Sequence, residues 1–359
     1  MSLKDFGWTA YFSNPFDQLG HHGSVPARVI LANRGFYLVR TADSEIHCRL
    51  RGRLYREAEI DETSRPVVGD WVACFEEGDG TGLIAALLPR RTKLSRRLPG
   101  GRAAEQIVVA NVDLVLLVMG LDRDFNPRRM ERMLVMTYES GARPIVILNK
   151  ADCVHDAEAK CLDIERLSPG VPVLVVSALD GQGIDQIAEF LRPACTLVLT
   201  GSSGVGKSTI INQLFGRTLA ETAPVRLSDG RGRHTTTQRQ LFRHPTGALL
   251  IDNPGIRELG LWDSAEGLDE AFDELLVLAE GCRFRDCRHE SEPGCAVAEA
   301  VRSGKLAQER LDSYHKLQRE LQYLEIKIDQ GAQRAQKQKW RAIHKAVRQE
   351  EKLRRRQPK

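Results

Sequence analysis

The sequence predicts an α/β fold whose mostly parallel sheet carries helices on both faces, preceded by a small β-barrel and followed by a helical domain. Between residues 105 and 260, continuous apolar strands alternate with helical segments, the pattern of a parallel sheet buried on both faces. Upstream, five short alternating strands broken by turn residues are typical of a small barrel. Downstream, a stretch rich in cysteine and histidine precedes long helical patterns.

The expected barrel strands leave two architectures open. An OB-fold is favoured, and the strand pattern alone also allows an SH3-like barrel. The five strands are expected near residues 28–31, 35–39, 46–50, 67–75 and 82–87.

The α/β region contains four buried strands and three helices by periodicity. The strands are expected at 112–119, 144–148, 171–176 and 196–200. The helices are expected at 127–138, 156–167 and 182–191, and further helices at 266–280, 305–328 and 332–355.

The composition indicates a cytoplasmic protein. Of the 359 residues, 42% are hydrophobic and 28% are charged, which allows several packed cores. No apolar stretch is as long as a membrane span, and the N-terminus lacks a signal-peptide pattern. We expect no membrane contact and a monomer. Of the eight cysteines, three lie within 282–295, which favours reduced thiols and one metal site.

The net charge of +4 is unevenly distributed. Residues 331–359 hold eleven lysines and arginines against two glutamates, so this tail carries +9 and the rest of the chain −5. A basic tail is typical of nucleic-acid contact, although a solvated helix that aids solubility has the same composition. The expected organisation is a flexible arm at 1–24, an OB-fold barrel at 25–100, the α/β domain at 101–264, a metal-binding helical domain at 265–330 and a basic tail at 331–359.

A phosphate-binding loop follows the strand at 196–200 and opens a helix. Its sequence G-S-S-G-V-G-K-S matches G-x-x-x-x-G-K-[ST] in the structural context that this pattern requires. Glycines let backbone N–H groups converge on a phosphate, and the helix N-terminus adds positive potential. Lys207 is expected to bridge the β- and γ-phosphates, and Ser208 to ligate Mg²⁺. The expected nucleotide contacts here are Gly201, Ser202, Ser203, Gly204, Val205, Gly206, Lys207, Ser208 and Thr209.

A guanine-specificity motif, N-K-A-D, ends the strand at 144–148. The Asp152 carboxylate can accept hydrogen bonds from both donors of guanine, and adenine lacks this donor pair, so ATP would leave the carboxylate unpaired. Asn149 can reach the base edge and the neighbouring loop, and the stem of Lys150 can lie over the ring. Ser177 and Ala178 end the next strand, where the backbone can contact the guanine O6.

Two further segments are typical of GTPase switches. The motif D-N-P-G places Asp252 to hold Mg²⁺ through water and the Gly255 N–H near the γ-phosphate. The polar run G-R-G-R-H-T-T-T before it should supply a threonine to Mg²⁺, and we favour Thr236. Many GTPases place a glutamine after D-x-x-G to orient water, but here Ile256 cannot donate a hydrogen bond. We therefore expect slow intrinsic hydrolysis, with His234 as the internal candidate to orient water unless a partner orders the site.

The order of these motifs is permuted. Ordinary GTPases run from the phosphate loop through both switches to N-K-x-D, whereas here residues 149–152 and 177–178 precede 201–208, and 252–255 come last. A domain tolerates such permutation because its strands can keep their places while the chain starts elsewhere. The predicted fold class is therefore a circularly permuted α/β P-loop GTPase, with a mostly parallel sheet, an N-terminal OB-type β-barrel and a C-terminal helical zinc-binding domain.

A cysteine and histidine cluster with the spacing C-x4-C-x-H-x5-C offers three thiolates and one imidazole. This is a complete tetrahedral set for one structural Zn²⁺ with no open position. The expected ligands are Cys282, Cys287, His289 and Cys295. Nearby arginines and the basic tail favour RNA contact around this site.

Together these features resemble the RsgA (YjeQ) family of bacterial GTPases of small ribosomal subunit biogenesis. The resemblance covers roughly residues 25–330 and rests on the barrel, the motifs N-K-A-D, S-A, G-S-S-G-V-G-K-S and D-N-P-G, the R-G-R-H-T-T-T run and the zinc cluster. It implies a late assembly or checkpoint factor that binds the small (30S) subunit, contacts 16S rRNA through its barrel and zinc domain, cycles between GTP and GDP, and is stimulated by the subunit.

Three alternatives remain open on the sequence alone. One is an ATP-using P-loop enzyme in which N-K-A-D is accidental. Another is an RNA- or DNA-binding regulatory GTPase that does not act on the ribosome. A third is a GTP-binding scaffold with negligible turnover, which the isoleucine after D-x-x-G makes conceivable.

Overall fold

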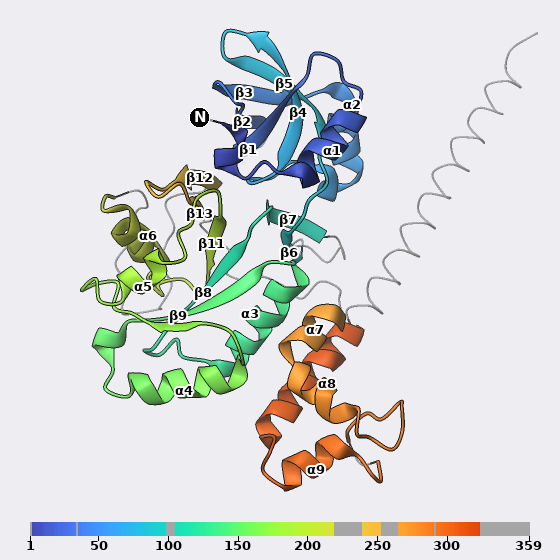
Figure 1. The fold of residues 1–359 in the computed structure, drawn as a ribbon, viewed down its shortest axis with the longest axis vertical. Coiled ribbons are helices and arrows are strands. Elements are labelled where there is room, and N and C mark those ends of the chain that lie inside the picture. Colours follow the sequence, from blue (N-terminus) through green and yellow to red (C-terminus); the bar gives the residue numbers. More distant parts are fainter. Residues whose placement is uncertain are drawn as a thin grey trace, which may run out of the picture.

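The computed structural model describes residues 2–33, 35–97, 105–218, 239–252, 265–290 and 292–323. A β-barrel, a central α/β domain and a C-terminal helical domain follow one another along the chain (Figure 1). No helix in these ranges is both long and apolar enough to span a membrane.

The barrel has five strands that close on themselves. They pair in the order β1-β2-β3-β5-β4, and β4 also pairs with β1; β3 and β5 run parallel. This closed order confirms the OB-type barrel. Its interior is filled by buried strand residues such as Val29, Val39 and Val72. The strands are β1 Val25–Asn33, β2 Phe36–Arg40, β3 Glu45–Leu50, β4 Trp71–Gly78 and β5 Thr81–Leu87; α2 Gly52–Ile60 and η2 Glu62–Ser64 lie between β3 and β4.

The N-terminal segment is folded rather than a flexible arm, which corrects the expectation for residues 1–24. It forms η1 Leu3–Phe6 and α1 Ala10–Gln18. Phe12 is 1% exposed, and the rings of Trp8 and Trp71 lie 4.7 Å apart. Aromatic burial against the barrel therefore holds this segment in place.

A two-stranded hairpin, β6 Lys93–Arg97 and β7 Glu105–Ala110, connects the barrel to the central sheet. The sequence pattern did not predict it. Its strands pair antiparallel, with Lys93 opposite Ala110.

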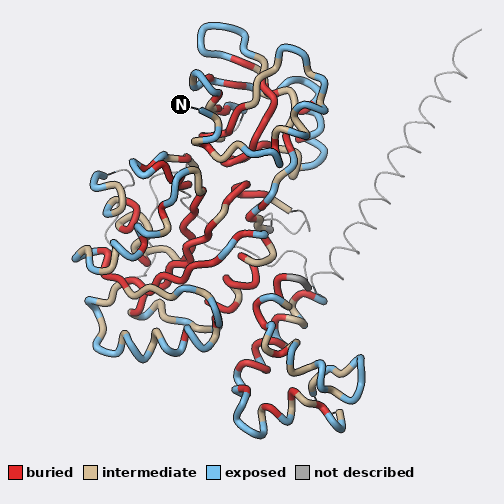
Figure 2. Tube along the Cα trace, viewed as in Figure 1, coloured by how far each residue is buried: buried red, intermediate tan, exposed pale blue. Residues whose placement is uncertain are grey.

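The central sheet pairs in the order β10-β9-β8-β11-β13-β12, parallel except for β12. Successive residues of its strands face opposite sides, so residues 115, 117 and 119 pack with α3 and α4, and residues 114, 116 and 118 pack with α5 and α6. Figure 2 shows these central strands as buried. The bounds are β8 Leu114–Gly120, β9 Arg143–Asn149, β10 Val173–Val175, β11 Thr196–Thr200, β12 Arg239–Arg243, β13 Leu249–Asp252, α3 Pro127–Glu139, α4 Ala157–Leu167, α5 Ile184–Ala188 and α6 Lys207–Phe215.

The barrel and the central sheet are joined edge to edge. Strand β12 pairs antiparallel with β1, with Leu31 opposite Gln240 and Ala32 opposite Arg239. The two domains thus share one ladder of eleven strands.

The C-terminal domain packs on α3. Its helices are α7 Ala265–Ala271, α8 Asp273–Ala279 and α9 Ala296–Arg302, and residues 308–323 are helical. The single helix expected at 266–280 is divided at Phe272, whose backbone leaves the helical region (ψ 34°). A buried Arg310 donates to Glu131 of α3 (2.9 Å) and to Glu274 of α8 (2.6 Å), which ties the two domains together.

Candidate nucleotide site and metal centre

The phosphate loop connects β11 to α6 and needs glycine at two positions. Gly201 has a φ of +148°, and a Cβ there would lie 2.1 Å from the Val118 carbonyl oxygen. Gly206 has a φ of +97°, and a Cβ there would lie 2.2 Å from the Asn149 side-chain nitrogen. Any side chain would therefore collide with neighbouring strands or with the loop that follows β9.

Lys207, the first residue of α6, lies over this loop. Its Nζ donates to the carbonyl oxygens of Gly201 and Ser202, both at 2.7 Å. Asp252 ends the neighbouring parallel strand β13, and burial raises the pKa of its carboxyl while the Lys207 charge lowers it. The loop, its lysine and Asp252 thus meet at the carboxyl edge of the sheet, where ligands of open α/β sheets bind.

Asn149 links the loops that follow β9, β10 and β11. It is 2% exposed, its Nδ2 donates to the Val205 carbonyl (2.7 Å), and its Oδ1 accepts from the Ala178 N–H (2.9 Å). We expected Asn149 to reach the base edge and the neighbouring loop. In the structure, its amide nitrogen and its amide oxygen are both hydrogen-bonded to loop backbone. It therefore fixes the phosphate loop relative to the S-A loop.

The Asp152 carboxylate is positioned by its neighbours in η3 Ala151–Cys153 and by the S-A loop. Its Oδ1 accepts from the Ser177 hydroxyl (2.7 Å), and its Oδ2 accepts from the Cys153 thiol (3.1 Å). The Ser177 hydrogen bond is the main reason that the pKa of Asp152 lies below the usual Asp range. The carboxylate is exposed and ionised, ready to accept donors from a ligand.

Lys150 takes a backbone conformation with φ +68° and pairs with Asp122, which follows β8 (2.8 Å). Partial burial opposes ionisation of Asp122, but the Lys150 hydrogen bond and charge lower its pKa overall. Gln213 of α6 donates to the Ala178 carbonyl (3.1 Å) and supports the S-A loop. Sequence reasoning missed Asp122 and Gln213; the position of Asp122 directly after a buried strand was the available signal.

Of the expected nucleotide residues, the structure brings together the N-K-A-D side chains, the S-A loop, the loop 201–206, Lys207 and Asp252. Ser208 and Thr209 lie in the first turn of α6. His234, Thr236 and Gly255 lie outside the described residues.

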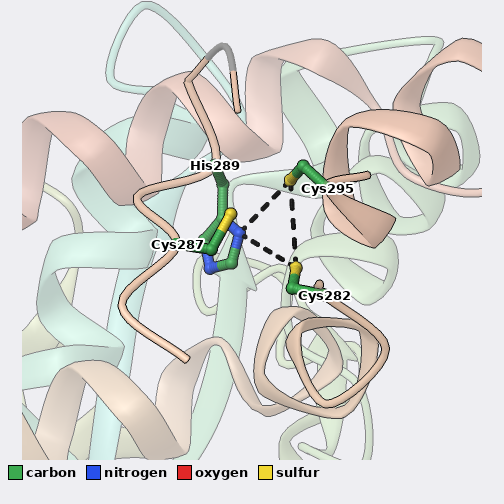
Figure 3. Close-up of side chains that lie close together, drawn as sticks. All are labelled: Cys282, Cys287, His289 and Cys295. Carbon is green, nitrogen blue, oxygen red and sulfur yellow. Dashed lines mark hydrogen bonds between the residues drawn. The ribbon is translucent and has the colours of Figure 1, made fainter. Parts of the chain in front are cut away.

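The four expected metal ligands converge in the C-terminal domain (Figure 3). Their ligand atoms all lie within 4.8 Å of one another. The His289 Nδ1 is 3.6 Å from the Cys282 Sγ and 3.5 Å from the Cys295 Sγ, and these two sulfurs are 3.9 Å apart. Tetrahedral Zn²⁺ with bonds of about 2.3 Å to sulfur and about 2.0 Å to nitrogen puts a nitrogen and a sulfur ligand about 3.5 Å apart and two sulfur ligands about 3.8 Å apart. The geometry therefore fits a tetrahedral metal ion.

Local structure favours the ligand forms of Cys282 and His289, whereas burial raises the pKa of the Cys287 thiol to about 11. Burial opposes ionisation of Cys282, but backbone N–H groups of Val297 and Ala296 at the start of α9 lower its pKa overall. Cys295 caps the same helix and accepts from the Ala298 N–H (3.3 Å). Burial lowers the pKa of His289, which keeps its imidazole neutral, as metal binding requires.

The nucleotide site lies at the carboxyl edge of the sheet and is assembled from motifs in permuted order. Together with the OB-type barrel and the Cys3His domain, it defines a circularly permuted P-loop GTPase. Comparisons with known proteins agree. The RsgA N-terminal domain model matches residues 28–84, and the RsgA GTPase model matches residues 87–262. The chain is 42% identical over 351 residues to the small ribosomal subunit biogenesis GTPase RsgA of Syntrophotalea carbinolica, covering 96% of each chain.

A further relative and two solved structures extend this agreement. RsgA of Methanosarcina acetivorans is 46% identical over 280 residues, or 78% of this chain and 76% of that one. YjeQ from Thermotoga maritima is 28% identical with a TM-score of 0.63, covering 83% of this chain and 98% of that one. YloQ, a circularly permuted GTPase, is 27% identical with a TM-score of 0.59, covering 84% and 96%. The chain belongs to the RsgA GTPase family.

Proposed function

We propose that the protein binds and hydrolyses GTP at the carboxyl edge of its central sheet. The observation that carries this proposal is the pair of hydrogen bonds made by Asn149. They fix the position of the phosphate loop relative to the S-A loop, which holds the guanine-reading Asp152. Asp152 accepts the two guanine donors, while the Ser177 hydroxyl donates to its Oδ1 and holds the carboxylate in place. The Ala178 N–H is already donated to Asn149, so Leu179 supplies the next backbone donor for the guanine O6.

The phosphates lie over the loop 201–206, with the Ser208 and Thr209 N–H groups at the start of α6. Lys207 exchanges its two carbonyl acceptors for phosphate oxygens, and this exchange costs little because both acceptors are neutral. Mg²⁺ would be held by Ser208, Thr236 and Asp252, and it would neutralise charge on the β- and γ-phosphates. Gly255 contacts the γ-phosphate, and His234 orients the attacking water, because Ile256 cannot do so.

The Cys3His cluster holds one structural Zn²⁺. A closed set of four protein ligands leaves no position for substrate, so the metal stabilises the fold of its loop. Three exposed arginines surround it, and the Arg283 guanidinium lies 5.6 Å from the ring centre of Phe284, which is 42% exposed. Exposed cations beside an exposed aromatic ring form a surface suited to RNA, in which phosphates pair with arginines and bases stack on rings. The arginines are Arg283, Arg285 and Arg288.

The names of the relatives indicate where this GTPase acts. We place it in late maturation of the small (30S) ribosomal subunit in the cytoplasm, as a monomer that binds 16S rRNA and is stimulated by the subunit. The barrel at 25–100, the zinc domain at 265–330 and the basic tail at 331–359 flank the GTPase domain at 101–264 as RNA-binding parts.

GTP hydrolysis measured alone and with purified small subunits tests this function. We expect strong stimulation by small subunits and little by large subunits. Loss of stimulation in H234A would assign the water-orienting role to His234, whereas stimulation that survives would assign it to the subunit. Competition by ATP as effective as by GTP would contradict the guanine assignment, and absence of stimulation would contradict the ribosomal role alone.

A further inference from the structure

A second pocket lies at the opposite edge of the central sheet from the nucleotide motifs. It has a volume of about 330 Å³ and lies where η1, the barrel and the start of β11 meet. Asp113 precedes β8, Arg143 begins β9 and Thr196 begins β11, so the pocket lies at the amino ends of the parallel strands. Five strand residues separate it from the phosphate loop, or about 15 Å. We call it the basic pocket.

The lining of the basic pocket has an excess of positive charge. Lys4, Arg28, Arg91, Arg143 and Arg192 line it, with Asp113 as its only carboxylate among the described residues. Asp113 is already used on both oxygens: Oδ1 accepts from Arg91, and Oδ2 accepts from the Thr196 N–H (2.7 Å). It cannot neutralise the remaining cations.

Three of these cations have no carboxylate partner within the described part of the chain. No described residue forms an ion pair with Lys4, Arg143 or Arg192. Their field is felt locally, since Arg143, Arg192 and Arg91 all lower the pKa of the neighbouring Cys195, which burial raises to about 11. All three residues are exposed, so water screens their mutual repulsion, and an anion between them gains from all three charges.

Arg28 adds a buried charge at the floor of the basic pocket. It is 1% exposed and bonds only to neutral acceptors: the carbonyls of Gly69 (3.3 Å), Phe6 and Asn111 (3.0 Å), and the Thr196 hydroxyl (2.9 Å). Burial lowers its pKa to about 10, although the guanidinium remains charged at neutral pH. No carboxylate of the described residues is hydrogen-bonded to this guanidinium, although Asp113 and Asp70 lie near enough to raise its pKa.

Trp71 packs beside the pocket, but its indole nitrogen is itself fully buried, so a ligand in the cavity does not reach it. The three cations without a carboxylate partner in the described ranges, Lys4, Arg143 and Arg192, favour a ligand rich in acceptor oxygens.

We propose that the basic pocket is a second anion site, distinct from the GTP site, that binds a phosphate group. Arginine and lysine pair with phosphate through charge-assisted hydrogen bonds, and 330 Å³ accommodates pyrophosphate or one nucleotide. A bound phosphate contacts η1 through Lys4, β9 through Arg143 and the segment before β11 through Arg192, and so fastens the N-terminal segment to the GTPase domain. The phosphate belongs either to a free small molecule or to the backbone of an RNA strand.

Calorimetric titration of the full-length protein with inorganic pyrophosphate tests this site. Excess GDP keeps the phosphate loop filled, and Mg²⁺ is omitted because it chelates pyrophosphate. We expect one binding event that R143Q and R192Q each weaken roughly tenfold, the loss expected for one charge-assisted hydrogen bond. The control R166Q removes an arginine of α4 that is 76% exposed and outside the pocket, and should bind as the wild type does.

A parallel titration with a hexauridylate oligonucleotide separates the two sources. Pocket-dependent binding of pyrophosphate alone indicates a free phosphorylated ligand, and pocket-dependent binding of the oligonucleotide indicates an RNA backbone. Affinities that are equal in wild type, R143Q, R192Q and R166Q, or absence of binding by both probes, would overturn the proposal. GTP affinity stays unchanged in the pocket variants, so this result stands apart from the test of GTPase function.

Discussion

Replacing Asn149 with alanine should separate the phosphate loop from the guanine loop. The substitution removes the hydrogen bonds to the Val205 carbonyl (2.7 Å) and from the Ala178 N–H (2.9 Å). Both partner residues are buried, Val205 at 1% and Ala178 at 2% exposure, so each backbone group is left without its partner. The protein still folds, because neither group belongs to a strand or helix of the core.

The size of the effect can be worked from these two bonds. Each unpaired buried group costs about 1–3 kcal/mol. Because water can enter at the edge of the sheet and hydrogen-bond to both groups, the total cost for the two groups lies near the lower limit, about 2–3 kcal/mol. Nucleotide binding must then restore the relative position of the two loops, so the free energy of binding becomes less favourable by the same amount. At about 1.4 kcal/mol per tenfold, the dissociation constants for GTP and GDP rise about 30- to 150-fold.

Fluorescent-GDP titration and denaturant unfolding of N149A measure both effects. The matched control is N126A, which removes an asparagine that caps α3 by accepting from the Arg129 N–H (3.0 Å). N126A should lose about 1 kcal/mol of stability and keep its nucleotide affinity. If N149A binds GDP as tightly as the wild type, the reasoning that Asn149 frames the site is refuted.

Three further predictions follow from other contacts. In S177A, the pKa of Asp152 should rise toward the usual Asp range, because the main hydrogen bond that lowers it is removed. The ionised carboxylate binds guanine above this pKa and loses that contribution as the pH falls through it, so GTP binding should weaken at a higher pH in S177A than in the wild type. A low-pH limb of GTP binding at the same pH in both proteins would contradict this. Metal analysis should find about one Zn²⁺ per chain, and H289A should lose it while C153S keeps it; equal content would exclude the cluster as the site. R310M leaves Glu131, which is 3% exposed, without its cation and should cost about 3–5 kcal/mol in denaturant unfolding, part of which R310M/E131M recovers; a cost below 1 kcal/mol would contradict a structural ion pair.

The sequence predicted the central sheet and the nucleotide motifs because both depend on short-range patterns. A continuous apolar run such as 114–120 is favourable in an α/β fold only as a strand buried on both faces. Glycine at 201 and 206 reflects a backbone geometry that no other residue tolerates. The role of Asn149 as a link between loops could not be predicted, because Val205 and Ala178 come close to it only through the order of parallel strands.

The N-terminal helices were missed although a signal was present. Trp8, Phe12 and Phe16 recur every four residues, as on one side of a helix, but the mixed polar and aromatic residues around them show no clear period and favoured an arm. Their burial depends on Trp71, which lies far away in the sequence. The basic pocket likewise combines Lys4, Arg143 and Arg192 from three distant segments, so only the fold reveals it.

The pairing of β12 with β1 also bears on solubility. A parallel sheet that ended at β12 would present a row of free N–H and C=O groups, a template on which other chains can add and aggregate. Here the barrel covers that row through the Leu31–Gln240 and Ala32–Arg239 pairs, while the other outer strand, β10, is kept to the three residues Val173–Val175. A GTPase domain expressed without its barrel should therefore be more prone to self-association than the full-length chain.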